Sequence, residues 1–135
     1  MNTSVVWIAS PASPKLDSWL GKARAAGFLP VRVDSTDAAL QVLTQFRAGI
    51  VVCHGTQQQG VADCERLLAD GMTVVAVIDD SRYTAIYLSI GCAAVLGDRC
   101  PGTVLVEMLK NVAAGKRNLV WPPPAAGSVP ETAAG

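Results

Sequence analysis

Short apolar runs alternate with amphipathic helical segments five times along this chain, and this alternation restricts the possible folds more than any other feature. The apolar runs are rich in β-branched residues, as strands buried on both faces are, and they span residues 5–9, 29–33, 50–53, 72–78 and 93–96. The segments with apolar residues at helical spacing cover 14–26, 36–46, 61–69, 81–90 and 101–114. Right-handed crossovers between such strands produce a parallel sheet with helices on both faces. The sequence therefore predicts a three-layer α/β sandwich with a five-stranded parallel sheet.

Residues that favour helix ends and loops mark several boundaries. Ser35 or Thr36 can accept a hydrogen bond from the free backbone N–H groups that begin the second helix, and Ser81 can do so for the fourth. Gly91 is expected to end the fourth helix, because glycine readily adopts the left-handed conformation found after many helices. A polar loop rich in Gln and Gly is predicted over 54–60, after the third strand.

Length and charge limit the organisation and the class of partner. A chain of 135 residues is long enough for one domain with its own core, which we place at 1–118. Residues 119–135, rich in Pro, Ala and Gly, are predicted to be a linker or tail. Eleven basic and eleven acidic residues cancel, so direct nucleic-acid binding by this segment is disfavoured.

The cysteines and the apolar runs indicate a cytoplasmic location. The cysteines lie at wide, irregular spacings with no CxxC pair, at Cys53, Cys64, Cys92 and Cys100. This distribution predicts reduced, buried thiols rather than a zinc or redox motif. No apolar stretch approaches the roughly 20 residues that span a bilayer, and the first run has no basic lead-in, so neither a membrane anchor nor a signal peptide is expected.

Residues 34–40, 51–53, 91–96 and 105–116 carry a resemblance to a known family. The first two segments resemble the second helix and third strand of bacterial response-regulator receiver domains, and 91–96 resembles the start of the fifth strand of that family. Residues 105–116 resemble the last helix of receivers that precede a DNA-binding helix-turn-helix. The resemblance covers about residues 4 to 118, and it implies a flavodoxin-like fold with strand order 2-1-3-4-5. It also implies a role in two-component signalling.

The positions that carry phosphorylation chemistry in receivers hold other residues here. The resemblance places the metal-binding acids of a working receiver at Ala9 and Ser10, and its phosphoacceptor aspartate at His54. The hydroxyl residue of a working receiver corresponds to Ile78 or Asp79, and its lysine corresponds to Asp98. Phosphoryl transfer requires a metal and cationic groups that neutralise the charge on the phosphoryl oxygens. We therefore expect a degenerate receiver that is not phosphorylated and not an enzyme, with no catalytic residue, metal or cofactor.

His54 is the only histidine, and it admits several roles. A phosphohistidine, a metal ligand and a pH switch are all chemically open to an imidazole. A zinc site would need more ligands, and Cys53 should point to the opposite face of the strand. A structural histidine is the favoured interpretation. The aspartates Asp34, Asp79, Asp80 and Asp98 could form an acidic rim around a cation, but aspartate is common in turns and helix starts for its own local hydrogen bonds.

The fourth helix supplies the candidate interaction face. Tyr83 and Tyr87 are four residues apart and so share a side of the helix, with Arg82 and Arg99 nearby in the fold that the resemblance implies. That surface corresponds to the usual receiver dimer face, formed by the fourth helix, fifth strand and fifth helix. The residues expected to face the core are Ala85, Ile86 and Ile90.

These observations favour regulation by contact. We expect a phosphorylation-independent module that forms a homodimer or binds a partner signalling protein, as the N-terminal part of a bacterial signalling or transcription regulator. The alternative is a small-molecule sensor that uses the vacated pocket, because Ala9, Ser10 and Ile78 would make that pocket wider and less polar.

Overall fold

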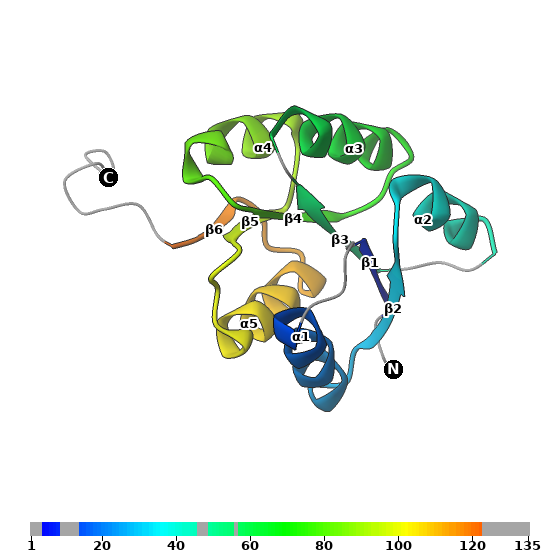
Figure 1. Cartoon of the computed structure of the whole chain (residues 1–135), viewed down its shortest axis with the longest axis vertical. Helices are drawn as coiled ribbons and strands as arrows, with labels where there is room; N and C mark the ends of the chain where they lie inside the picture. Colours follow the sequence, from blue (N-terminus) through cyan, green and yellow to red (C-terminus); the bar gives the residue numbers. More distant parts are fainter. Residues whose placement is uncertain (1–3, 9–13, 46–48, 56, 123–135) are drawn as a thin grey trace.

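Six parallel strands form one sheet with helices on both faces (Figure 1). The computed structural model describes residues 4–8, 14–45, 49–55 and 57–122. The strands are β1 Ser4–Ile8, β2 Leu29–Val33, β3 Ile50–Gly55, β4 Val74–Ile78, β5 Ala94–Gly97 and β6 Leu119–Trp121. The helices are α1 Pro14–Ala25, α2 Thr36–Leu43, α3 Gln57–Ala69, the 3-10 turn η1 Ser81–Tyr83, α4 Thr84–Ile90 and α5 Gly102–Ala113.

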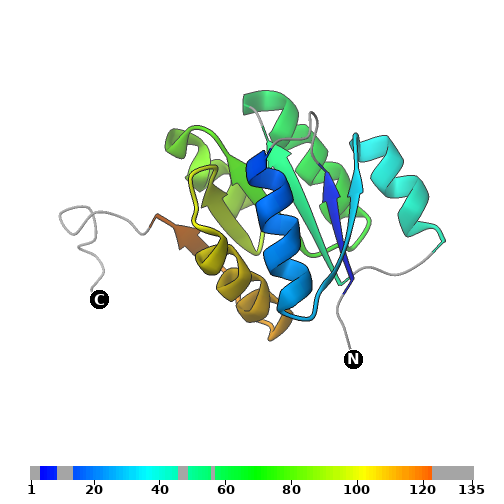
Figure 2. The same ribbon diagram turned by 60° about the horizontal axis from the view of Figure 1, so that its bottom comes forward.

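The strand order is β2-β1-β3-β4-β5-β6, which confirms the predicted flavodoxin-like order and adds a sixth strand. Helices α1 and α5 cover one face of the sheet, and α2, α3 and α4 cover the other (Figures 1 and 2). Because all six strands are parallel, their carboxyl ends lie at one edge of the sheet. In open α/β sheets this edge is where ligands bind.

Side chains of the central strands alternate between two apolar clusters. Val5 and Trp7 of β1 pack under α1 and α5, whereas Val6 and Ile8 pack under α2 and α3. Every residue of β4 is buried, as its uninterrupted apolar sequence predicts for a central parallel strand. Helix α1 buries the predicted stripe, Leu16, Trp19, Leu20 and Ala23. The core is therefore two layers thick, with the sheet between the layers.

The third strand is longer than predicted. β3 pairs with β4 through Gly55, opposite Ile78, so His54 lies within the sheet and not in a loop. Helix α3 begins at Gln57, because glutamine has a high helix propensity and can occupy a first turn. The prediction of a polar loop over 54–60 is therefore wrong, and His54 is held more rigidly than the sequence indicated.

The fourth helix differs from the sequence prediction in the residue that caps its start and in the side that is buried. The Asp80 carboxylate, and not Ser81, caps this segment by accepting a hydrogen bond from the Arg82 backbone N–H at 3.0 Å. The 3-10 turn that follows changes the phase of α4, so Tyr87 is fully buried while Ile86 is 44% exposed. Ala85 is exposed as well, and the predicted inward face is wrong for both residues. By contrast, the Ser35 side chain caps α2 as predicted.

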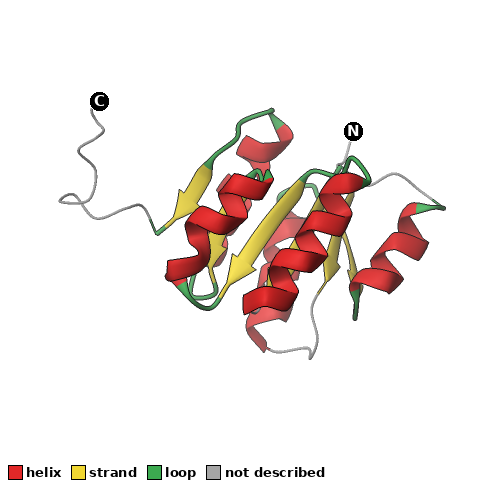
Figure 3. Cartoon of the chain, turned by 90° about the horizontal axis from the view of Figure 1, so that it is seen from above, coloured by secondary structure: helices red, strands yellow, loops and turns green. Residues whose placement is uncertain are grey.

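The sixth strand consists of residues assigned to the tail from sequence. Gly115 and Asn118 both adopt positive φ angles, of 96° and 61°, and turn the chain back along the sheet after α5. β6 then pairs with β5, placing Leu119 and Trp121 against the cluster under α1 and α5 (Figure 3). The sheet thus extends three residues beyond the predicted boundary at 118, and β5 is an interior strand.

The contribution of β6 can be measured with paired Leu→Ala variants. Leu119→Ala should lower the free energy of unfolding by about 1–2 kcal/mol, since it removes a partly buried side chain from the core. Leu29→Ala, at a position 49% exposed on the β2 edge, is the control and should change it by less than about 0.5 kcal/mol. Urea unfolding followed by tryptophan fluorescence gives both values. Equal, small effects would mean that 119–121 is not part of the folded sheet.

Candidate functional site

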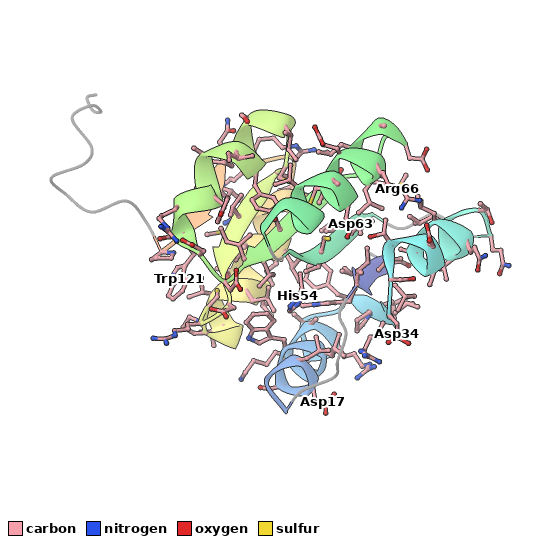
Figure 4. All side chains as sticks on the ribbon, turned by 45° about the horizontal axis from the view of Figure 1, so that its top comes forward. Asp17, Asp34, His54, Asp63, Arg66 and Trp121 are labelled. Atoms are coloured by element: carbon pink, nitrogen blue, oxygen red, sulfur yellow. The ribbon has the colours of Figure 1, made fainter. Side chains whose placement is uncertain are left out.

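His54 lies near the carboxyl end of β3, on the face covered by α1 (Figure 4). Its Nε2 accepts a hydrogen bond from the indole Nε1–H of Trp7 at 2.9 Å. The imidazole also lies beside the ring of Trp19, with 5.8 Å between ring centroids, and 6.5 Å separates it from the ring centroid of Trp7. β1, β3 and α1 thus bring two indoles and one imidazole into a single cluster, named here the Trp7–His54–Trp19 cluster.

This environment keeps His54 uncharged. Burial lowers the pKa of His54 from 6.5 to about 4, and the nearby carboxylate of Asp98 opposes the shift only in part. Because Nε2 accepts the Trp7 hydrogen bond, the ring proton is on Nδ1. The Nε2 lone pair is therefore occupied, and it is not available to a metal ion or a phosphoryl group while this bond is intact.

Cys53 points to the other face of the sheet, as predicted. It packs with Cys64 and Cys92 in the cluster under α2, α3 and α4, and all three thiols are free and buried. Hydrogen bonding between Cys64 and the other two thiols, together with burial, raises the pKa of the Cys64 thiol. A shared His–Cys metal site is therefore not formed. Within the described ranges, no three histidine, cysteine or acidic side chains converge as metal ligands.

The acidic residues at the carboxyl edge do not act as one group. Asp80 caps η1 and forms an ion pair with Arg82 at 2.7 Å, and Asp34 forms one with Arg32 at 3.0 Å. These contacts fit the interpretation that the aspartates stabilise nearby turns and helix starts through local hydrogen bonds. Asp79 and Asp98 are exposed and both line a cleft farther along the edge.

That cleft has a volume of about 360 Å³ and lies at the carboxyl ends of β4, β5 and β6. Its walls are formed by Ile78, Asp79, Ser81, Gly97, Asp98, Arg99, Trp121 and Pro122. Ile78, Asp79 and Asp98, three residues of the predicted degenerate pocket, therefore come together here. His54, a fourth, lies apart from Trp121 of this cleft (Figure 4). Ala9 and Ser10 are outside the described residues. Trp121 and Pro122 were missed from sequence because they were assigned to the tail.

The candidate interaction face is changed by the burial of Tyr87. Its side chain is completely buried, and burial raises the pKa of its phenol, so it cannot contact a partner. Arg82 and Arg99 are exposed and Tyr83 is partly buried. Ile86 replaces Tyr87 as the apolar residue that α4 presents to solvent.

Comparison with known proteins supports the fold. No family model and no curated protein matches the sequence. Among solved structures, a response regulator of Thermotoga maritima aligns with a TM-score of 0.75 and 12% identity, over 84% of this chain and 99% of that one. A CheY-like receiver domain protein of Methanospirillum hungatei aligns with a TM-score of 0.71 and 14% identity, over 85% and 96%. An orphan response regulator of H. pylori gives 0.67 and 12%, over 80% and 93%.

The chain therefore has the fold of response-regulator receiver domains. Each described helix is too short or too polar to cross a membrane.

The depressed pKa of His54 should appear as a pH dependence of stability. Between pH 6.5 and about 4 the unfolded chain binds the imidazole proton and the folded chain does not, so stability rises with pH across this window. We expect the contribution of His54 to the free energy of unfolding to be constant above pH 6.5. On acidification to pH 4 this contribution should fall by at most about 3 kcal/mol. Urea unfolding at a series of pH values measures the effect.

His54→Gln is the matched control for this experiment, since a glutamine carbonyl can still accept from Trp7 but does not titrate. Subtracting its pH profile from that of the parent removes the carboxylate contributions. His54 is the sole histidine, so the difference belongs to one group. Identical profiles for the parent and His54→Gln would contradict a half-buried imidazole with a lowered pKa.

Proposed function

We propose that this domain is a receiver-like signalling regulator that acts through protein contact and is not phosphorylated. The likeness in fold to response regulators, one of them an orphan regulator, supports a signalling role. The observation that carries the proposal is the hydrogen bond from Trp7 to His54, which occupies the only free nitrogen at the acceptor position. We further propose a cytoplasmic protein that forms the N-terminal part of a signalling or transcription regulator.

The electrostatics of the site support the loss of phosphorylation. A phosphoryl group at position 54 would meet the carboxylate of Asp98, whose influence already reaches the imidazole. The sequence after β1 offers Ala9 and Ser10 where a receiver has acids for Mg²⁺, a cation that prefers carboxylate oxygens. Charge on the transferred group would therefore remain uncompensated. On this proposal the domain is not an enzyme, and it needs no metal or cofactor.

Phosphorylation can be tested with acetyl phosphate and MgCl₂, followed by intact-protein mass spectrometry. We expect no phosphoryl adduct on the parent and none on His54→Asp, because restoring the acceptor does not restore the cation ligands. A phosphorylation-competent receiver domain treated in parallel verifies the reagent. An adduct on the parent would overturn the proposal. An adduct on His54→Asp alone would show that metal binding survives and only the acceptor is lost.

The surface of η1 and α4 is the proposed contact face. Ile86 is one of only three large apolar residues exposed in the described part of the chain. Arg82 of the preceding turn η1 is exposed as well, so this short segment presents both an apolar and a basic side chain to solvent. A large apolar side chain beside an arginine is a common composition of an interface centre. The proposed partner is a second copy of the domain or another signalling protein, and not nucleic acid, since the charges of the chain balance.

Self-association provides the measurement for this face. Ile86→Lys should weaken dimerisation at least tenfold in sedimentation equilibrium, because a charged side chain would have to be desolvated at the centre of the contact. Gln41→Lys, an exposed position on α2, introduces the same charge on another surface and should leave the association unchanged. Equal association constants for the two variants would exclude Ile86 from the interface.

A small-molecule sensor is the second candidate, and the cleft at the ends of β4, β5 and β6 is the observation that favours it. A ligand could then supply the bias that phosphorylation supplies in an active receiver, provided that it binds two conformations with different affinities.

A further inference from the structure

The cleft at the carboxyl ends of β4, β5 and β6 is built by three separate segments. The backbone N–H of Asp98 donates to the Ile78 carbonyl at 2.9 Å, which ties the end of β5 to the end of β4. β6 pairs with β5 and brings Trp121 and Pro122 to the opposite wall. The segments that form the walls of the cleft are thus held in place by the pairing of the strands.

Gly97 lies between these walls. A Cβ atom at position 97 would lie 3.5 Å from the Pro122 ring and 3.7 Å from the Trp121 side chain, in ordinary contact distance. Any side chain longer than alanine would project among the lining residues. A small residue therefore keeps the cleft open between the end of β5 and the end of β6.

We propose that this cleft binds a small organic cation with an apolar, preferably flat, body. Among the described residues that line the cleft, Asp79 and Asp98 are acidic and Arg99 is basic, so these residues together carry a net negative charge. The indole of Trp121 and the ring of Pro122 add an apolar wall. An indole face attracts a cation through its quadrupole, and a carboxylate can accept the ligand's N–H groups.

The same chemistry disfavours other ligands. An anion would meet two carboxylates and a single arginine. A bare divalent cation would find only two carboxylates, and the described residues hold no group of three metal ligands. The volume, about 360 Å³, lies near the lower end of the range for ligand sites, which are about 300–1,000 Å³, and excludes large molecules.

Binding here has a structural consequence for β6. A ligand between Asp98 and Trp121 would bridge the turn after β5 and the end of β6, and so hold the outer strand on the sheet. The cleft does not include His54, although Asp98 both lines it and acts on that imidazole. The inference deepens the second candidate function, the small-molecule sensor, and rests on it; it does not depend on the loss of phosphorylation.

Three related phenols separate the charge requirement from the ring requirement. Tyramine carries an ammonium group, 4-ethylphenol is neutral, and 3-(4-hydroxyphenyl)propionate carries a carboxylate. The ¹⁵N–¹H spectrum of the full chain follows binding, because each of the three tryptophans gives one indole N–H signal. We expect tyramine to shift the Trp121 indole and the amides of Gly97, Asp98 and Arg99 in a saturable manner, with a dissociation constant of about 1 mM or below. The neutral and anionic probes should bind at least tenfold more weakly.

Exposed variants test the lining without endangering the fold. Asp98→Asn and Asp79→Asn should each weaken tyramine binding about fivefold or more, as expected for loss of a charged partner in a partly exposed cleft. Asp70→Asn is the control, since Asp70 follows α3 at the opposite edge of the sheet, and it should bind tyramine like the parent. Trp121→Leu keeps an apolar wall and should lose the preference for tyramine over 4-ethylphenol.

The proposal is overturned by any of three results. These are the absence of saturable shifts at about 10 mM tyramine, equal responses to the three probes, and shifts confined to the hollow between α1 and α5 beside Lys22 and Thr103. None of them bears on whether the domain is phosphorylated, so failure of this proposal and failure of the proposed function are distinguishable.

Discussion

The hydrogen bond between the Trp7 indole and His54 determines what the carboxyl edge of this sheet can do. Trp7 has no exposed surface, and a buried N–H without an acceptor costs about 1–3 kcal/mol. The imidazole Nε2 satisfies that donor at 2.9 Å, and burial in turn keeps the imidazole neutral. The tryptophan needs an unprotonated acceptor, and the partial burial of the histidine favours that unprotonated state.

This interaction follows from the alternation of side chains in parallel strands. β1 and β3 are neighbours in the sheet, with Trp7 opposite Val52, so His54 lies two residues farther along on the same face. An aspartate at position 54 would carry a charge into the space occupied by two indole rings. The imidazole at position 54 is thus matched by its aromatic surroundings, which is the basis of the proposal that this position is not phosphorylated.

The repeated apolar runs were sufficient to predict five of the six strands and the layers of helices, whereas the strand order was predicted from the resemblance to receiver domains. The period-2 pattern also predicted that Cys53 and His54 face opposite sides. The phase of α4 was not predictable, because it depends on the 3-10 turn capped by Asp80, which exchanges Ile86 and Tyr87 between surface and core. β6 was missed for a different reason: a three-residue strand has little periodicity, and the prolines after it indicated a linker.

The added strand changes which part of the carboxyl edge can receive a ligand. The ends of β1 and β3 carry the Trp7–His54–Trp19 cluster, in which the Trp7 indole N–H is satisfied by the His54 imidazole and the Trp19 ring packs beside both. The half formed by β4, β5 and β6 is open, half polar, and bordered by an aromatic residue that only β6 provides. Asp98 links the two halves, since its carboxylate lines the cleft and also acts on His54. A cation bound to Asp98 would weaken the one interaction that favours protonation of His54, and would thereby strengthen the neutral state on which the hydrogen bond to Trp7 depends.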